Sequence, residues 1–334
     1  MVFVYFLIAS IVTVYSAMKL SNYADVLSEK TSFGGLLIGT VLLAAATSLP
    51  EVTTTISAIV IDNPDIAIAN VLGSNIFNVL VIAVFDILFR RKRLFLLASY
   101  THRITATLGI VLTIIVMVAM LLDTTYQLIG IGLSSILLVI VYGLGMWVIS
   151  KINIQVKSHI LQEEIQAESK ITEPKVADIS VRQAVIGFAV FSLVILVSGS
   201  ALAILGDKIA IITGLGSTFV GSFLIAATTS LPEVVSVYAA LKLSNVNLAL
   251  GAVLGSNIFN MLIIAFADLV YRHGSILGAI DPIQFVTAFG GAVMALLLLV
   301  TLFYRKAKNL WVYSIPPTII VITYFIVTFI IFTQ

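Results

Sequence analysis

Residues 39–51 read GTVLLAAATSLPE, and residues 221–233 read GSFLIAATTSLPE. Each copy places a glutamate directly after a proline in a segment that is otherwise almost wholly apolar. An acidic residue at the centre of a spanning helix costs roughly 2.5 to 3.5 kcal/mol on insertion scales, so a glutamate kept there indicates a function. Proline removes a backbone donor and crowds the carbonyl four residues earlier. Each segment therefore predicts a broken helix in which the carbonyl of Ala46 or Thr228 is freed.

The overall composition predicts a helical membrane protein with many spans. Of the 334 residues, 60% are hydrophobic and 10% are charged, and the mean hydropathy is +1.16. A water-soluble fold of this size does not tolerate such values. The absence of cysteine excludes disulfides and thiolate metal sites, and the three histidines are too scattered for zinc chemistry. We interpret the N-terminal apolar run as a first spanning helix and not as a cleaved signal peptide, because no basic region precedes it.

Apolar runs long enough to span a membrane predict ten helices, five in each half of the chain. They fall at residues 2–18, 33–60, 66–89, 104–122 and 127–149, and begin again at residues 184, 217, 247, 285 and 310. We expect residues 1–150 to form a first repeat and residues 183–334 a second. The polar stretch 151–182 between them predicts a linker with a short amphipathic helix and a loop.

The two halves contain the same sequence motif in corresponding positions. With a shift of 182 residues, 39–78 align with 221–260 without a gap, and 21 of the 40 positions are identical, including all of VLGSNIFN. Equivalent helices are five apart in the order of the ten spans, which is an odd number, so they enter the membrane from opposite sides. The sequence therefore predicts two inverted five-helix repeats, an architecture that places a substrate site near the middle of the membrane in secondary transporters.

Basic residues predict the orientation of the chain. With ten spans, the odd-numbered loops share one face of the membrane, and nearly all lysines and arginines lie on or beside those loops. The positive-inside rule then makes the odd loops and the linker cytoplasmic in a cell membrane, with both termini outside.

Helical spacing brings hydroxyls, amides and carboxylates to shared faces. Thr47 lies four residues before Glu51, and the second copy repeats this spacing. The following helices each add a serine and an asparagine four apart. If the repeats bring these segments together, six to eight hard oxygens surround one point, which suits calcium better than magnesium. The candidate metal-ligating residues are Glu51, Glu233, Thr47, Thr229, Ser48, Ser230, Ser74, Ser256, Asn78 and Asn260.

Two carboxylates close together at low dielectric need positive charge from a divalent cation, monovalent cations or protons. Competition among these charges favours antiport, because the empty charged form is penalised in the membrane. We expect transported Ca²⁺ and Na⁺ (or H⁺), a lipid bilayer around the protein, no separate cofactor, no nucleic acid and no obligatory protein partner.

T-S-L-P-E in two inverted halves, each followed by G-S-N-I-F-N, resembles the repeats of the calcium/cation antiporter superfamily, and within it the prokaryotic sodium/calcium exchangers. The resemblance covers nearly the whole chain. It implies a core of helices 2, 3, 7 and 8, across which helices 1 and 6 slide to alternate access. It further implies that the two glutamates and the carbonyls of Thr47 and Thr229 bind calcium. The resemblance assigns sodium to the oxygens of Ser48, Ser74, Ser230 and Ser256, with the carbonyls of Ala44 and Ala226.

The chain departs from the sodium exchangers in two respects. It has Ala46 and Thr228 where glycine is usual, and Asn78 and Asn260 where one aspartate is usual. Proton-coupled calcium exchangers also have amides at the latter positions, although their acidic motif differs. The sequence therefore favours calcium exchange and leaves coupling to sodium or to protons open.

Other interpretations remain for individual residues and for the whole chain. Asn78 and Asn260 are also suited to hydrogen bonds between helices. Asp86 and Asp268 each lie four residues before an arginine, which predicts solvated ion pairs near helix ends. A passive cation channel is the alternative of another class. An enzyme is not expected, because no histidine, cysteine or serine–base pair accompanies the glutamates.

Overall fold

The computed structural model describes residues 1–30, 46–90, 94–122, 127–128, 131–164, 179–242, 244–303 and 309–334. These residues are helical apart from short connections and one antiparallel pair of two-residue strands, β1 (Gln127–Leu128) and β2 (Ile131–Gly132). The helices of the first half are α1 (Val2–Lys30), α3 (Leu49–Val60), α4 (Pro64–Leu88), η1 (Leu94–Leu97), α5 (Thr101–Leu122) and α6 (Leu133–Glu164). Those of the second half are α7 (Val181–Thr213), α8 (Ser217–Phe219), η2 (Val220–Ile225), α9 (Ala226–Thr229), α10 (Leu231–Lys242), α11 (Val246–Val270), α12 (Ile276–Ala279), α13 (Gln284–Phe303) and α14 (Leu310–Phe332).

Within the described residues, eight helices are long and apolar enough to cross a membrane, or nine if the bent segment from Ser217 to Lys242 counts as one span. The chain is therefore a multi-pass membrane protein. α3 is a shorter apolar helix, and residues 33–45 of the predicted helix 33–60, which include Ala44, lie outside the described residues. The exact number of ten spans stays a prediction.

The helix that carries Glu233 is broken where its proline predicts. Its two parts meet at Ser230 and differ in direction by 42°. Ser230 has φ −89° and ψ 3°, and Ser48, at the equivalent position before α3, has φ −90° and ψ 9°. Shortly before the second break, the chain forms a π-helix, η2. π-Helices are rare in proteins, and those that occur are often at functional sites.

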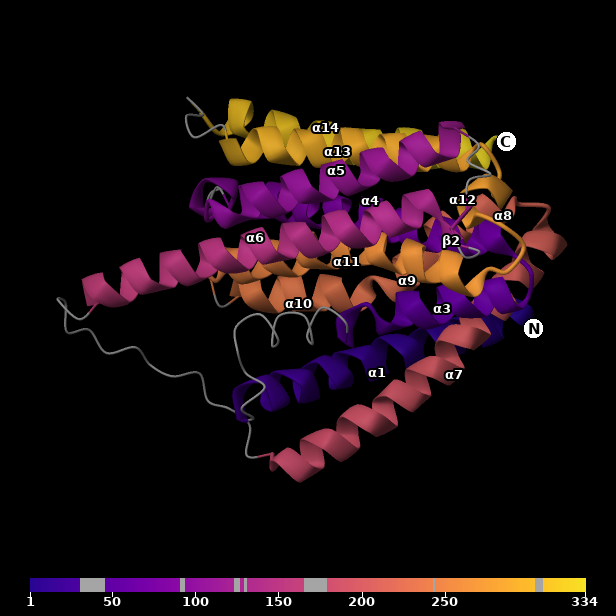
Figure 1. Ribbon diagram of the computed structural model, residues 1–334, viewed down its shortest axis with the longest axis horizontal. Coiled ribbons are helices and arrows are strands. Elements are labelled where there is room, and N and C mark those ends of the chain that lie inside the picture. The colour runs from indigo at the N-terminus through magenta and orange to yellow at the C-terminus, as the bar shows by residue number, and fades with distance from the viewer. Residues whose placement is uncertain are drawn as a thin grey trace.

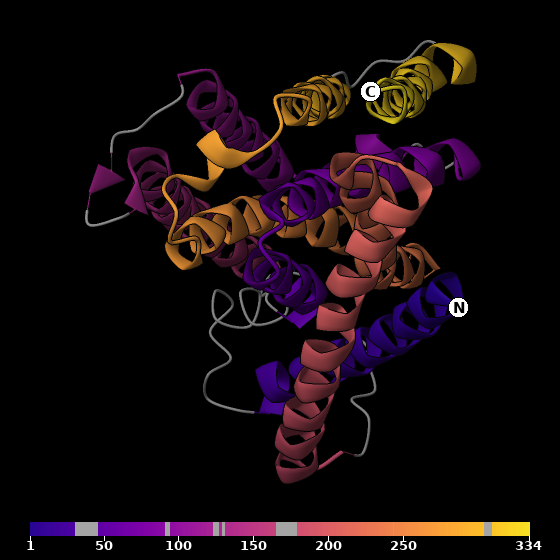
Figure 2. The same ribbon diagram turned by 90° about the vertical axis from the view of Figure 1, so that its right-hand side faces the viewer.

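The two helices that follow the breaks form the centre of the molecule. α4 and α11 pack against each other, and α3 and α10 flank them. α5, α13 and α14 cover one side of this centre, while α1 and α7 lie on the other and pack along each other (Figure 1). α7 is inclined to the central helices, as the end-on view makes plain (Figure 2).

Glycines allow α4 to approach η2 very closely. A Cβ atom added to Gly73 would lie 2.4 Å from the Cα atom of Ser222, and one added to Gly221 would lie 2.6 Å from the Cβ atom of Ala69. Small residues at such crossings are typical of helix packing in membranes. This contact fixes the segment before Glu233 against the helix that follows Glu51.

Several predicted boundaries are wrong. The fifth helix begins at Leu133 and not at residue 127, because β1 and β2 occupy the start of that apolar run. It continues to Glu164, so the helical part of the polar stretch 151–182 extends a spanning helix. α7 begins at Val181, where Ser180 and Gln183 form a capping box. α1 runs to Lys30, well beyond the predicted end at residue 18.

The predicted ion pairs of Asp86 and Asp268 are wrong as well, because neither side chain is exposed to solvent. Asp86 Oδ1 accepts from Leu94 N at 3.1 Å and from the Tyr313 hydroxyl at 2.5 Å. Asp268 Oδ1 accepts from Ile276 N at 2.8 Å, and its Oδ2 accepts from Gly132 N at 2.7 Å. Each aspartate thus holds the loop that leaves its own helix, eight residues further along the chain.

Candidate ion-binding site

Glu51 lies in the first turn of α3 and is fully buried. Its Oε1 atom accepts from Ser74 Oγ of α4 at 3.4 Å and from Ser230 Oγ at 3.2 Å. The hydroxyl of Thr229 lies beside these groups, 3.4 Å from Ser74 Oγ. The break in the second half therefore supplies the Ser230 hydroxyl to the glutamate of the first half.

Glu233 lies in the first turn of α10 and is 1% exposed. Its Oε1 atom accepts from Ser256 Oγ of α11 at 3.1 Å, and the Thr47 hydroxyl bonds to the same carboxylate. Ser256 Oγ also lies 3.0 Å from Ser48 Oγ. Ser256 thus repeats for Glu233 the contact of Ser74 with Glu51, whereas Ser48, the equivalent of Ser230, bonds to Ser256.

The two carboxylates belong to one buried cluster, because Ser48 Oγ of the first break lies 3.0 Å from Ser256 Oγ, which donates to Glu233, and Ser230 Oγ of the second break donates to Glu51. Each carboxylate has one oxygen, Oε2, that is buried and has no hydrogen-bond partner among the described residues. Burying an anionic oxygen without a partner is costly. These two oxygens, with the surrounding hydroxyls, form an acceptor set that suits a hard cation.

In the described part of the chain, the side chains that donate to the two carboxylates carry hydroxyls and not basic groups. The segments 46–60 and 209–241, which carry the two glutamates, have no lysine, arginine or histidine. Among the described residues, no group of three or more histidine, aspartate or glutamate side chains is placed to hold a metal. The site therefore consists of two carboxylates and neutral oxygens, which is compatible with a cation that binds and leaves.

Asn70 is a site residue that the sequence analysis missed. Its Nδ2 donates to the backbone oxygen of Glu51 at 3.4 Å and to Thr55 Oγ1 at 3.3 Å, and its Oδ1 accepts from Thr229 Oγ1 at 3.2 Å. Asn70 is fully buried and links α3 to α9. The repeat could not reveal it, because the equivalent residue of the second copy is Ala252.

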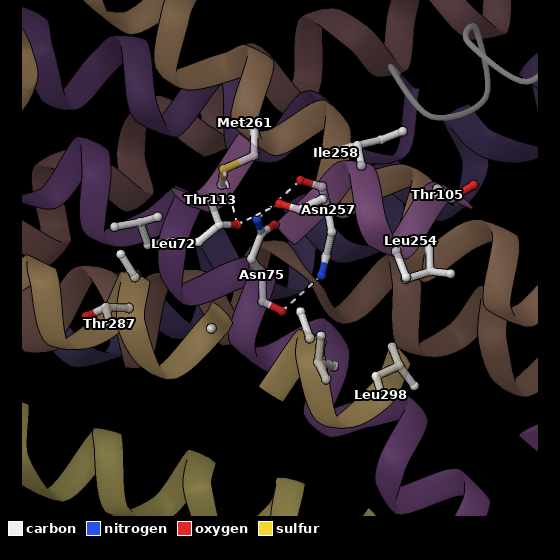
Figure 3. Close-up of a pocket in the computed structure, with 16 residues that line it drawn as sticks. Leu72, Asn75, Thr105, Thr113, Leu254, Asn257, Ile258, Met261, Thr287 and Leu298 are labelled. Atoms are coloured by element: carbon white, nitrogen blue, oxygen red, sulfur yellow. Dashed lines mark hydrogen bonds between the residues drawn. The ribbon is translucent and has the colours of Figure 1, made fainter. Parts of the chain in front are cut away.

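Asn75 and Asn257 were also missed, although both belong to the repeated motif. Nδ2 of each donates to the backbone oxygen of the other at 3.2 Å, where α4 and α11 cross (Figure 3). The periodicity of the helices placed them one residue away from the face of Ser74 and Ser256. The signal that could have revealed them is that all eight residues of VLGSNIFN are identical in the two copies, and not only the serine and asparagine four residues apart.

Asn78 and Asn260 are held by this central pair. Asn78 Nδ2 donates to Asn257 Oδ1 at 3.0 Å, and Asn260 Nδ2 donates to Asn75 Oδ1 at 2.9 Å. Their role in hydrogen bonds between helices is therefore confirmed. Both Oδ1 atoms are buried and have no partner among the described residues.

A small cavity lies beside Asn75 and Asn257 (Figure 3). Its volume is about 30 Å³, enough for no more than about two water molecules. Its described lining comes from α4, α5, α11 and α13 and includes no carboxylate. The charged site is therefore elsewhere, on the side of α4 and α11 that faces α3 and α10.

Comparison with known sequences gives matches over most of the chain. A sequence model of the sodium/calcium exchanger protein family matches residues 1–151 and 183–334. The inner membrane protein YrbG of Escherichia coli (strain K12) is 22% identical over 307 residues, which are 91% of this chain and 89% of that protein. The putative antiporter CaxA of Alkalimonas amylolytica is 26% identical over 283 residues, 82% of each chain.

Solved structures match the fold. The crystal structure of the H⁺/Ca²⁺ exchanger CAX aligns with a TM-score of 0.66 at 15% identity and covers 99% of this chain and 88% of its own. The sodium-calcium exchanger NCX_Mj, soaked with 10 mM Na⁺ and zero Ca²⁺, aligns with a TM-score of 0.57 at 22% identity and covers 98% of each chain. At these identities the likeness extends to the fold alone.

Proposed function

Because the chain belongs to the sodium/calcium exchanger protein family, we propose that it is a secondary antiporter that exchanges Ca²⁺ for Na⁺ by alternating access. The family consists of exchangers and not of enzymes. The observation that carries the proposal for this chain is the pair of buried glutamates, Glu51 and Glu233, which share one cluster of hydroxyls and each keep one oxygen without a partner among the described residues. Calcium supplies the charge that this pair lacks.

We assign the ligands from the contacts around the two carboxylates. Calcium takes oxygens from both glutamates and from the backbone carbonyls of Thr47 and Thr229. Sodium takes the hydroxyls of the four serines that surround the carboxylates, together with the Oδ1 atoms of the two amides. The serines are Ser48, Ser74, Ser230 and Ser256, and the amides are Asn78 and Asn260. The carbonyl of Ala226 already accepts from Thr229 Oγ1 and Ser230 N, so it is a weaker candidate.

Coupling to protons is the second candidate. It is favoured by the amides at Asn78 and Asn260, which leave the site with the two glutamates as its carboxylates. A carboxylate can release calcium to bind a proton as readily as to bind sodium, so the same residues serve either counter-ion. A passive channel usually forms its ring of carboxylates from several subunits. Two buried carboxylates in one chain fit an exchanger better.

The proposed architecture is ten spans in two inverted repeats, residues 1–150 and 183–334, joined by a cytoplasmic linker. Local features that recur 182 residues apart support the repeat. Asn63 and Asn245 cap α4 and α11, and each follows a residue with positive φ, Asp62 (61°) and Ser244 (58°). Both termini lie at one end of the molecule, which is compatible with an even number of crossings (Figure 1). The distribution of basic residues puts these termini outside the cell.

Calcium flux into proteoliposomes tests the function. Purified protein is reconstituted, and uptake of Ca²⁺ is measured with an outward gradient of Na⁺, with an outward gradient of H⁺, and with neither. Uptake driven by sodium supports the first proposal, and uptake driven by protons alone supports the second. Equal uptake in all three conditions would rule out antiport.

The glutamates are tested by isosteric neutralisation. We expect Glu51→Gln and Glu233→Gln each to lower exchange at least a hundredfold, because one carboxylate cannot balance a divalent cation in a buried site. Glu163→Gln, at the end of α6 away from the site, is the matched control and should exchange at the wild-type rate. Wild-type exchange in either site variant would remove that glutamate from the ligand set.

A further inference from the structure

The charge of the site depends on how four asparagines are held. Asn78 and Asn260 direct their amide nitrogens at the Oδ1 atoms of Asn257 and Asn75. Asn75 and Asn257 cannot turn to accommodate another group, because the Nδ2 of each is committed to the backbone oxygen of the other. We call these four residues the asparagine lock.

The lock selects amides over carboxylates. An ionised aspartate only accepts hydrogen bonds, so at position 78 or 260 it would set one acceptor against another. In a buried place, two acceptors without a shared hydrogen repel each other and leave an anion without a partner. Asn78 and Asn260 therefore contribute oxygens to the site without contributing charge.

The two glutamates are the charged residues of the stretches that carry the site. No lysine, arginine, histidine or aspartate occurs in the four stretches that carry the site residues, 31–60, 66–85, 209–241 and 246–267. Glu51 and Glu233 are the acidic residues of these stretches. The residues that bond to their side chains are serines and threonines, which are neutral.

We propose that the asparagine lock limits the charge of the site's own side chains to two, so that the protein exchanges one divalent cation for two monovalent cations and moves no net charge. The proposal rests on the exchange function proposed above. A buried site crosses the membrane most readily when its charge is cancelled, because an uncompensated buried charge is costly. One Ca²⁺ cancels two carboxylates, and so do two monovalent cations. A third monovalent cation would leave one positive charge in excess.

Wild-type protein in proteoliposomes tests this directly. Ca²⁺, Na⁺ and pH are made equal on both sides, and a potassium gradient with valinomycin imposes a membrane potential of either sign. We expect no net movement of Ca²⁺. If each cycle moved one elementary charge, 100 mV would drive about fortyfold accumulation or depletion of Ca²⁺ inside the vesicles. Such a change would overturn the proposal.

A second arm separates failure of this proposal from failure of the function. With the potential clamped at zero, a gradient of Na⁺ or H⁺ must drive Ca²⁺ uptake in the same vesicles. Absence of that uptake contradicts the exchange function itself. Gradient-driven uptake together with potential-driven accumulation keeps the function and refutes electroneutral exchange.

Two matched variants on α11 test the lock. Asn260→Asp places a carboxylate against Asn75 Oδ1, whereas Asn245→Asp changes the helix cap outside the site, where aspartate caps as well as asparagine. We expect Asn245→Asp to resemble the wild type. Asn260→Asp should either lose exchange while remaining folded or exchange with a response to the potential. Wild-type exchange that ignores the potential in Asn260→Asp would contradict the lock.

Discussion

At the scale of the residue, the glutamates and their hydroxyl partners could be predicted from sequence, whereas the amides that support them could not. Glu51 and Glu233 are conspicuous because the membrane penalises them. Asn70 has no counterpart in the second copy, and Asn75 lies off the face that spacing alone identifies. A buried amide becomes informative only when its partner on another helix is known, and that partner is distant in sequence.

The partners of the buried aspartates could not be predicted from sequence either. The spacing of Asp86 and Arg90 predicted a solvated pair, yet Asp86 is buried and accepts from Leu94 N and from the hydroxyl of Tyr313. Helical spacing describes which residues share a face, but it does not say whether a carboxylate turns back to the loop beyond its own helix. Backbone amides outside a helix are invisible to that pattern.

We expect Tyr313→Phe to lower the free energy of unfolding by about 1–3 kcal/mol, because it removes a donor from the buried carboxylate of Asp86. Unfolding of purified protein in detergent, titrated with denaturant, measures the loss. Tyr5→Phe is the control, since Tyr5 is exposed. Equal stability of the two variants would mean that Asp86 finds another donor.

At the scale of the element, the proline predicted the break between α9 and α10 correctly because its effect on the backbone is local. The start of α6 was predicted less well. The apolar run continues through QLIGIG, so hydropathy could not distinguish a short strand pair from the first turns of a helix. The contact between α4 and η2 was also beyond reach, because it joins residues far apart in the chain.

That contact predicts the effect of filling a glycine. We expect Gly73→Ala to destabilise the protein by roughly 1–3 kcal/mol, since its methyl group would meet the backbone of Ser222 at 2.4 Å and the backbone would have to shift. Gly143→Ala is the control. Gly143 lies exposed on α6 with nothing described within 4 Å of the added carbon, and alanine favours a helix. Thermal unfolding in detergent should separate the two variants.

Hydroxyl contacts of α7 offer a test of which helices move together. Thr13 Oγ1 of α1 donates to Ser198 Oγ at 2.8 Å, and Ser57 Oγ of α3 donates to Ser200 Oγ at 2.7 Å. If α1 and α7 slide as one unit across the core, a disulfide between positions 13 and 198 should leave exchange nearly intact. A disulfide between positions 57 and 200 should block it, because it ties a moving helix to a fixed one.

The effect of each engineered disulfide can be measured without interference from other thiols, because the chain has no cysteine of its own. Calcium flux is measured in the oxidised protein and again after reduction. Recovery on reduction in the 57–200 pair distinguishes a locked transporter from a misfolded one. Equal inhibition by both disulfides would contradict movement of α1 and α7 as a unit.

At the scale of the whole molecule, the sequence could predict membrane insertion and the duplication, because composition and repeats are global properties. The number of spans and their orientation depend on segments such as 31–45, whose placement the structure does not describe. The orientation can be tested independently. We expect Ser169→Cys in the linker to react with an impermeant maleimide only in inverted membrane vesicles, and Gln334→Cys at the C-terminus only in intact spheroplasts. The reverse pattern would place the termini inside.

Asp268 connects the order of synthesis to the finished structure. Its carboxylate accepts from the amide of Gly132, which immediately precedes α6, although 136 residues separate the two. While the ribosome is still making α7 to α10, the backbone amide of Gly132 at the start of α6 does not yet have the Asp268 side chain to bond to. In the nascent chain, the start of α6 therefore lacks this contact until α11 has been made. A chain that stops before residue 268 lacks the bond between Gly132 and Asp268 altogether.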